Sequence, residues 1–208
     1  EAFGTGRVGQ CYRVGDEPLV FEAAGNFRAD EGSCSLWIQP EFSGDDTACY
    51  CTFFGVERWG MLYKYLLHST LTFGTAKPER DLYYDCNVPS IADWRPGQWH
   101  HVVTTWSRQQ DRRRVYVDGV LAAEAPFPYH RVVERGPLFI GAGCELYPDP
   151  TAHSALDEVA IWDLALDATQ VSELFTLGTA GSPLATGDLA PVEPGNPTGR
   201  PAIAADLP

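Results

Sequence analysis

The sequence has little positive charge and no long apolar run. The 208-residue chain holds 15 lysine and arginine residues against 28 acidic ones, which gives a net charge of −13. A protein whose main partner is a nucleic acid or an anionic membrane needs a basic surface, so we expect neither partner. No apolar stretch approaches the ~20 residues that cross a bilayer, so we also expect no membrane insertion.

The chain begins at Glu1 without a hydrophobic leader, which is typical of a processed, secreted or cell-surface protein. An even number of cysteines in an exported chain favours disulfides. The six are Cys11, Cys34, Cys49, Cys51, Cys86 and Cys144. Their spacing matches no common zinc pattern, and six cysteines allow fifteen pairings, among which the sequence does not choose.

Short segments rich in apolar, aromatic and β-branched residues alternate with turn residues along most of the chain. Examples are residues 19–22, 33–38, 62–67, 100–106 and 158–162. The pair Asp118-Gly119 between two such runs predicts a β-hairpin, because both residues tolerate the positive φ angles of a tight hairpin turn. Many short strands separated by turns predict an all-β sandwich or barrel.

One short helix is expected near residues 168–177. Asp167 suits the N-cap position, and Gln170 three residues later completes a capping box. Gly178 is expected to end the helix. Residues 179–208 are rich in proline and glycine and contain no aromatic residue, which is typical of a linker or tail. We therefore expect a domain of residues 1–178 and a tail of residues 179–208 that docks on its own domain or on a neighbour.

Four stretches of the sequence resemble the laminin G-like, concanavalin A-like domains of many secreted bacterial proteins. They are GRVGQCYRV near the start, GSCSLWIQP at 32–40, GQWHHVVTTW at 97–106 with RRVYVDGVLAAE at 113–124, and LFIGAG at 138–143 with ALDEVAIWDLALDATQVSELF at 155–175. The resemblance implies a two-sheet antiparallel jelly-roll sandwich. Members serve as carbohydrate-binding modules, lectins, or adhesion and assembly modules, and many hold a structural calcium ion.

The resemblance also implies candidate metal ligands. Asp157, the aspartate of the LDEV motif, matches a calcium ligand of the family, with Asp16 and Glu158 as weaker companions. Glycosidases of the same architecture use an E-x-D-x-x-E run, which residues 157–163 lack. His100 and His101 are adjacent on a strand and point to opposite faces, so they cannot ligate one metal together. We expect no catalytic activity.

Sugar binding needs exposed aromatic side chains beside polar groups. The candidates are Trp59, Trp94, Tyr63 and Tyr147. Two functions remain open. The first is an extracellular carbohydrate-binding module for a glycan or polysaccharide, which predicts a monomer. The second is a structural subunit of an extracellular filament or surface assembly, which predicts that residues 179–208 contact another chain by strand addition.

Overall fold

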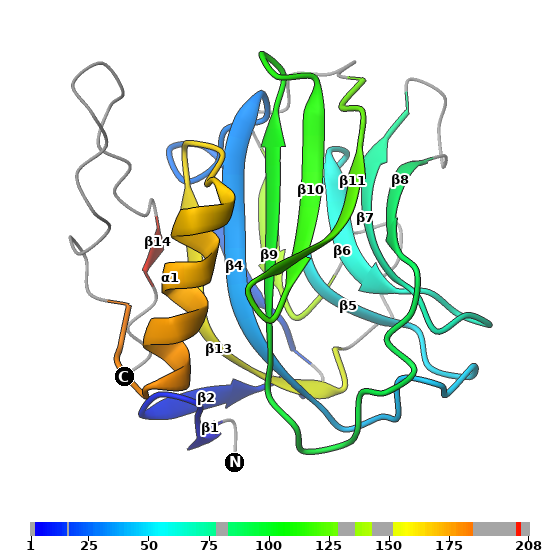
Figure 1. Ribbon diagram of the computed structural model, residues 1–208, viewed down its shortest axis with the longest axis vertical. Helices are drawn as coiled ribbons and strands as arrows, with labels where there is room; N and C mark the ends of the chain where they lie inside the picture. Colours follow the sequence, from blue (N-terminus) through cyan, green and yellow to red (C-terminus); the bar gives the residue numbers. More distant parts are fainter. Residues whose placement is uncertain are drawn as a thin grey trace.

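The computed structural model describes residues 3–15, 17–77, 83–128, 136–142, 152–184 and 203–204. These residues form two antiparallel sheets and one helix (Figure 1). The two sheets share a core to which both contribute side chains. The all-β, two-sheet antiparallel jelly-roll sandwich expected from the sequence is therefore confirmed.

Strand pairing defines a first and a second sheet. The first sheet runs in the order β1 (Phe3–Thr5), β2 (Gln10–Arg13), β13 (Ser154–Trp162), β4 (Glu31–Pro40), β9 (His100–Ser107), β10 (Arg112–Val117) and β11 (Val120–Ala125), and β14 (Ile203–Ala204) pairs with β13. The second sheet runs in the order β3 (Leu19–Glu22), β12 (Pro137–Ile140), β5 (Cys51–Val56), β6 (Gly60–Lys64), β7 (Leu71–Ala76) and β8 (Tyr83–Val88).

Aromatic side chains from both sheets meet in the core. The ring centroids of Trp59 and Trp106 lie 4.9 Å apart, and Phe27 lies 4.6 Å from Trp59. Buried indoles need a partner for the ring N–H. Trp59 donates to the carbonyl of Ala29 at 3.1 Å, and Trp106 donates to the carbonyl of Arg28 at 2.9 Å. These tryptophans therefore fix the segment before β4 as well as filling the core.

The expected hairpin joins β10 to β11. Asp118 and Gly119 have φ angles of 49° and 79°, as a tight turn with two left-handed residues requires. The Asp118 carboxylate also reaches the neighbouring strand, where it accepts the backbone N–H of His101 at 2.8 Å and lies 2.9 Å from Nδ1 of His100. The turn is therefore fixed both by its local sequence and by β9.

The helix α1 (Ala168–Thr179) begins as the sequence predicts. Asp167 accepts from the backbone N–H groups of Thr169 and Gln170, and the Gln170 side chain accepts from the backbone of Asp167. The predicted end is wrong, because Gly178 lies inside the helix. Gly181, with a φ angle of 72°, ends it instead: its N–H donates to Gly178, and that of Ser182 donates to Leu177.

Gly178 is needed for packing rather than for ending the helix. A Cβ atom at this position would lie 2.4 Å from Nε1 of Trp37. Because glycine has no side chain, the end of α1 can lie directly against Trp37 of β4.

We expect Gly178→Ala to lower the free energy of unfolding by about 1 to 2 kcal/mol. Overpacking against Trp37 costs about 1 to 3 kcal/mol, which exceeds the gain of about 1 kcal/mol in helix propensity. Urea unfolding measures the change. Ser172→Ala, an exposed position of the same helix, is the control, and a stabilising effect of both variants would contradict the close contact.

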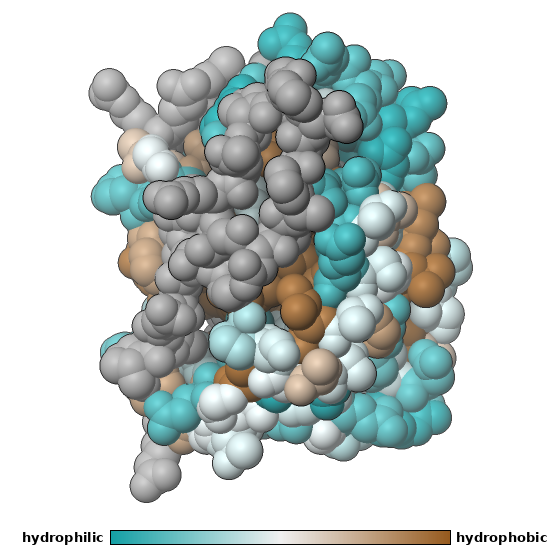
Figure 2. All heavy atoms as spheres, turned by 60° about the vertical axis from the view of Figure 1, so that its left-hand side comes forward, coloured by the Kyte–Doolittle hydropathy of each residue, from teal (hydrophilic) through white to brown (hydrophobic). Residues whose placement is uncertain are grey.

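The outer face of the first sheet is covered by α1. A second buried cluster joins the helix to the sheet and comprises Val103, Tyr116, Ala160, Trp162, Leu166, Val171 and Leu174. Figure 1 shows the helix lying along β4 and β13. In the space-filling view that brings this side forward, hydrophilic residues occupy the upper right and apolar residues gather toward the middle (Figure 2).

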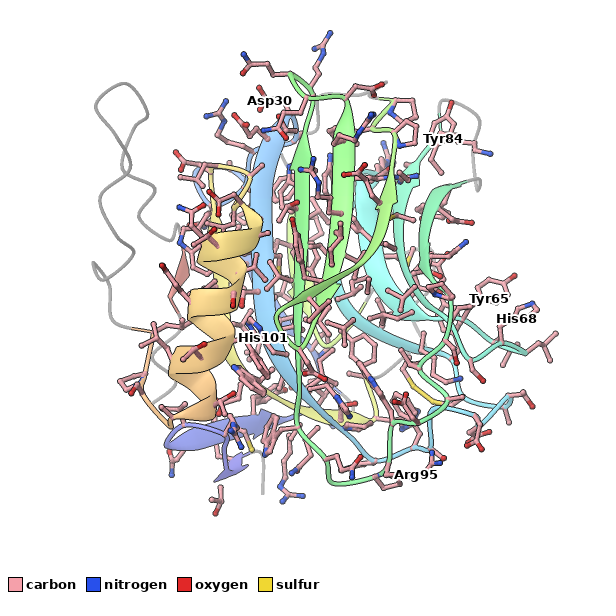
Figure 3. The ribbon with its side chains drawn as sticks, viewed as in Figure 1. Asp30, Tyr65, His68, Tyr84, Arg95 and His101 are labelled. Carbon is pink, nitrogen blue, oxygen red and sulfur yellow. A yellow bond between two sulfur atoms is a disulfide. The ribbon has the colours of Figure 1, made fainter. Side chains whose placement is uncertain are left out.

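His101 is buried beneath this helix. It is 1% exposed, and its ring lies 5.0 Å from Trp37 and 6.1 Å from Phe175 between ring centroids. Its Nε2 atom lies 2.9 Å from Oγ of Ser35, and its Nδ1 atom has no hydrogen-bond partner among the described residues. Figure 3 shows His101 beside the lower half of α1, on the side toward β9. The helix therefore closes over an imidazole whose second nitrogen is unsatisfied.

Two described residues of the C-terminal tail pair with the domain of the same chain. The backbone of Ile203 is paired with Ile161, and that of Ala204 with Ala160. β2 pairs with Leu156 and Ala155 of the same strand, while β4 occupies the other edge of β13. One edge of β13 is therefore completed by two segments from opposite ends of the chain.

Candidate functional site

The outer face of the second sheet carries polar and aromatic side chains. Leu62, Phe73 and Cys86 belong to the core, so their neighbours in sequence point outward. Cα pairing places Thr52, Tyr63, Thr72 and Asn87 in one row across β5 to β8. Gly55, Met61, Gly74 and Asp85 form the next row. We call the part of this surface around Tyr63 the tyrosine face; it comprises Tyr50, Tyr63, Tyr65, His68, Asp85 and Asn87.

Tyr63 is the centre of the tyrosine face. Its ring centroid lies 5.6 Å from that of Tyr50 and 6.1 Å from that of Tyr65. A Cβ atom on Gly74 would lie 3.2 Å from the Tyr63 ring, so the glycine gives the ring room to lie close to the sheet. Tyr63 itself is 5% exposed, whereas Tyr65 is 44% exposed. Tyr63 therefore forms the floor of this surface, and Tyr65 forms part of its accessible wall.

Two polar side chains of β8 lie beside the rings. The Tyr63 hydroxyl donates to Oδ1 of Asp85 at 3.4 Å, and the Thr72 hydroxyl donates to Oδ1 of Asn87 at 2.7 Å. Asp85 and Asn87 are both exposed. Partial burial of the Asp85 carboxyl raises its pKa, although nearby Arg113 opposes this. A carboxylate, an amide and flat aromatic surfaces together can accept and donate hydrogen bonds and stack on apolar faces.

A braced loop between β6 and β7 carries the exposed end of the tyrosine face. Lys64 is buried and donates from Nζ to the carbonyls of Cys49 and His68, at 3.1 and 3.3 Å. Its burial lowers the pKa of the ammonium. Tyr65 and His68 stack with centroids 5.5 Å apart and project together from the end of β6 (Figure 3). The loop thus holds these two rings in place.

The structure does not place the predicted tryptophan platforms at the surface. Trp59 is 3% exposed in the core, and Trp94 is 2% exposed and stacks on His100 with a centroid distance of 4.3 Å. The prediction of exposed platforms at these two residues is wrong, because both indoles pack against other aromatic rings and are buried. Tyr63 lies on the tyrosine face, and Tyr147 lies outside the described residues.

Sequence reasoning missed Tyr65, Asp85 and Asn87. The alternation of β8 was a usable signal, since its exposed Asp85 and Asn87 flank the buried Cys86. These residues contact side chains of other strands, and the sequence alone does not show the register in which the strands pair.

Asp157 does not have the surroundings of a calcium ligand. It is 3% exposed, its Oδ2 accepts the backbone N–H of Val8 at 2.8 Å, and its Oδ1 accepts that of Glu158 at 2.9 Å. Calcium takes six to eight oxygen ligands, whereas this carboxylate faces N–H donors. Within the described residues, no three His, Cys, Asp or Glu side chains gather as a metal site. The described residues therefore do not fit calcium at Asp157.

The Glu158 carboxylate is engaged by a backbone amide elsewhere. Glu158 sits in a β-bulge of β13 with a φ angle of 47°, and its Oε2 accepts the backbone N–H of Leu184 at 2.6 Å. Asp16 lies outside the described residues.

Of the five cysteines that the structure describes, three are free thiols. Cys49 and Cys51 form a disulfide. Cys11, Cys34 and Cys86 are buried and free, so the prediction of disulfides at these three is wrong. The thiols of Cys11 and Cys86 lie against the backbone carbonyls of Thr5 and Arg113 instead. Burial raises the pKa of the Cys86 thiol to about 11 and also raises that of Cys34. Cys144 lies outside the described residues.

No helix in the described ranges is long and apolar enough to cross a bilayer.

Solved structures with the same fold include binding domains of several proteins. Domain 4 of AbnA, a GH43 extracellular arabinanase from Geobacillus stearothermophilus, in complex with arabinotriose, superposes with a TM-score of 0.63 at 20% identity, over 83% of this chain and 79% of that chain. A native heptameric SAP-like pentraxin from Limulus polyphemus gives 0.54 at 20% identity, over 73% and 71%. The botulinum neurotoxin type G receptor binding domain gives 0.53 at 14%, over 71% and 38%.

At these identities the structural matches show the fold alone. No curated protein matches the sequence. The family model of the concanavalin A-like lectin/glucanases superfamily, however, matches residues 15–172, well over half of the chain. The chain therefore belongs to the concanavalin A-like lectin/glucanase superfamily.

Proposed function

We propose that this protein is a non-catalytic, extracellular carbohydrate-binding module whose ligand lies on the tyrosine face. The observation that carries the proposal is the Tyr63 ring, which joins exposed Asp85 on one side, through its hydroxyl, to exposed Tyr65 on the other. Sugars present hydroxyl groups around a ring with apolar faces, which such a surface complements. On the second sheet Met61, Tyr63 and Thr72 are buried, so the accessible part of the tyrosine face is its rim, which comprises Tyr65, His68, Asp85 and Asn87.

A neutral glycan fits this surface best. The described residues of the tyrosine face include one carboxylate, Asp85, and no lysine or arginine, while the whole chain has a net charge of −13. An anionic polysaccharide would meet repulsion rather than a basic partner. The arabinotriose complex of AbnA domain 4 makes arabino-oligosaccharides the first ligands to test.

The absence of a suitable carboxylate pair supports a binding rather than a hydrolytic role. A retaining glycosidase needs two carboxylates about 5 Å apart on one surface. The two rows across β5 to β8 contain a single acidic residue, Asp85. Asp157 holds backbone N–H groups at a buried position on the other sheet and is not placed to protonate a substrate.

Isothermal titration with arabinotriose and with other neutral oligosaccharides tests the proposal. We expect Asp85→Ala to weaken binding at least tenfold, because a hydrogen bond to a charged group contributes about 1.5 to 3 kcal/mol. Tyr65→Ala should weaken it by a similar factor through the loss of a stacking surface.

Phe3→Ala is the matched control, since Phe3 is 37% exposed but lies on β1 of the first sheet. It should bind as the unmodified protein does. If all three variants bound with equal affinity, the ligand would not lie on the tyrosine face. If the unmodified protein bound no neutral glycan, the proposed function would be wrong.

A further inference from the structure

The junction around Asp157 joins three segments that are distant in sequence. The turn Gly6–Gly9 lies between β1 and β2, Asp157 and Glu158 form the bulge of β13, and Gly178 and Thr179 lie at the end of α1. We infer that Arg7 and backbone N–H groups of this chain hold the junction together at the position where members of the superfamily bind calcium. The fold of this chain then does not depend on calcium.

The carboxylate side of the junction is filled by the turn. Gly6 and Gly9 close the turn through a backbone hydrogen bond of 3.0 Å, and Gly9 has a φ angle of 61°. The turn passes so close to Asp157 that a Cβ atom on Gly6 would lie 2.4 Å from Oδ2. The N–H of Val8 points at the same oxygen from 2.8 Å. Backbone N–H donors thus satisfy the charge of Asp157.

The cation of the junction comes from Arg7 of the same turn. Its Nε donates to the carbonyl of Gly178 at 3.1 Å, and its Nη2 donates to the carbonyl of Thr179 at 2.9 Å. Its guanidinium lies 5.0 Å from the centroid of the Trp37 ring. The last carbonyls of a helix lack intrahelical donors and carry partial negative charge, so an arginine is well suited to them.

Two neighbouring positions of one turn, Arg7 and Val8, thus donate hydrogen bonds to two different elements. Asp157 of β13 receives the amides of the turn, and Arg7 of the turn reaches the end of α1. The bulge adds a further contact, because Glu158 receives the N–H of Leu184 at the start of the tail. Each oxygen of Asp157 already accepts a backbone N–H, so a bound cation would have to compete with the Val8 and Glu158 amides for the carboxylate.

Thermal unfolding of the full chain in excess EDTA and in excess calcium chloride tests this inference without any substitution. We expect the same melting temperature in both. Arg7→Ala should lower the melting temperature by roughly 5 °C in both solutions, because two hydrogen bonds to helix carbonyls are lost. Calcium should not restore the lost stability.

Arg58→Ala is the matched control, since Arg58 is 69% exposed at the side chain and lies far from the junction in sequence; it should shift the melting temperature by about 1 °C or less. A fall in the melting temperature of the unmodified protein in EDTA would overturn the inference. So would a stoichiometric calcium-binding isotherm that is lost in Asp157→Asn, or rescue of Arg7→Ala by calcium.

Discussion

Replacing Trp59 by alanine is expected to lower the free energy of unfolding by about 4 kcal/mol. Truncating a buried tryptophan removes its apolar contacts and leaves a cavity, which together cost about 3 to 5 kcal/mol. Trp59 is 3% exposed, touches Phe27 and Trp106, and satisfies the carbonyl of Ala29. Urea unfolding followed by circular dichroism measures the change.

The comparison with Tyr65→Ala separates core from binding surface. Tyr65 is 44% exposed, so its removal should change the free energy of unfolding by less than about 0.5 kcal/mol while weakening glycan binding. A Trp59→Ala protein that remained fully stable but lost glycan affinity would contradict the placement of Trp59 in the core.

Lowering the pH from neutral to 4 is expected to cost about 3 kcal/mol of stability through His101. Burial lowers the pKa of this imidazole from 6.5 to about 4, and the nearby Asp118 opposes the effect. In the unfolded chain the imidazole binds a proton below about pH 6.5, whereas in the folded protein it stays neutral until about pH 4. Stability is therefore full above pH 6.5, falls as the pH drops from 6.5 to 4, and levels off below that.

The measurement is the free energy of unfolding as a function of pH for the unmodified protein and for His101→Gln. Carboxylates titrate in the same range, so the difference between the two curves isolates the imidazole. That difference should change by about 3 kcal/mol between pH 7 and pH 4. His68→Gln, at an exposed position, is the control. Parallel curves for the unmodified protein and His101→Gln would show that the imidazole is not buried under α1.

Local signals in the sequence predicted the elements whose geometry depends on a few neighbouring residues. Asp118-Gly119 requires nothing beyond its own φ angles to turn the chain, and the Asp167–Gln170 capping box closes within four residues. The strand predicted at residues 19–22 coincides with β3. The pattern of short strands indicated a sandwich or barrel, and the resemblance to the laminin G-like family added the jelly-roll arrangement.

Tertiary contacts decided the features that the sequence did not predict. A glycine near the end of a helix ordinarily stops it, yet Gly178 is retained inside α1 because Trp37 of β4 leaves no room for a side chain. Trp59 and Trp94 lie beside turn residues, which suggested exposure, but Ala29 and His100 receive their indoles from elsewhere in the chain. No window of sequence contains both partners of such contacts.

The sequence predicted only part of the candidate binding site, because the contacts within it also join distant segments. Tyr63 was a candidate from its residue type, whereas its relation to Asp85 exists only because β6, β7 and β8 pair in one register. The calcium expectation came from the family resemblance at Asp157, Asp16 and Glu158, which could not show that Val8, far away in sequence, would supply an N–H to the Asp157 carboxylate.

The buried thiols allow local unfolding of each sheet to be measured. Cys34 is 0% exposed and Cys86 is 1% exposed, one on each sheet. A thiol reagent can label them only when the strand that carries them detaches, so the labelling rate at each site measures how often that sheet opens under native conditions. Equal labelling rates at Cys34 and Cys86 would show that the sandwich opens as one cooperative unit, and unequal rates would show that one sheet opens before the other.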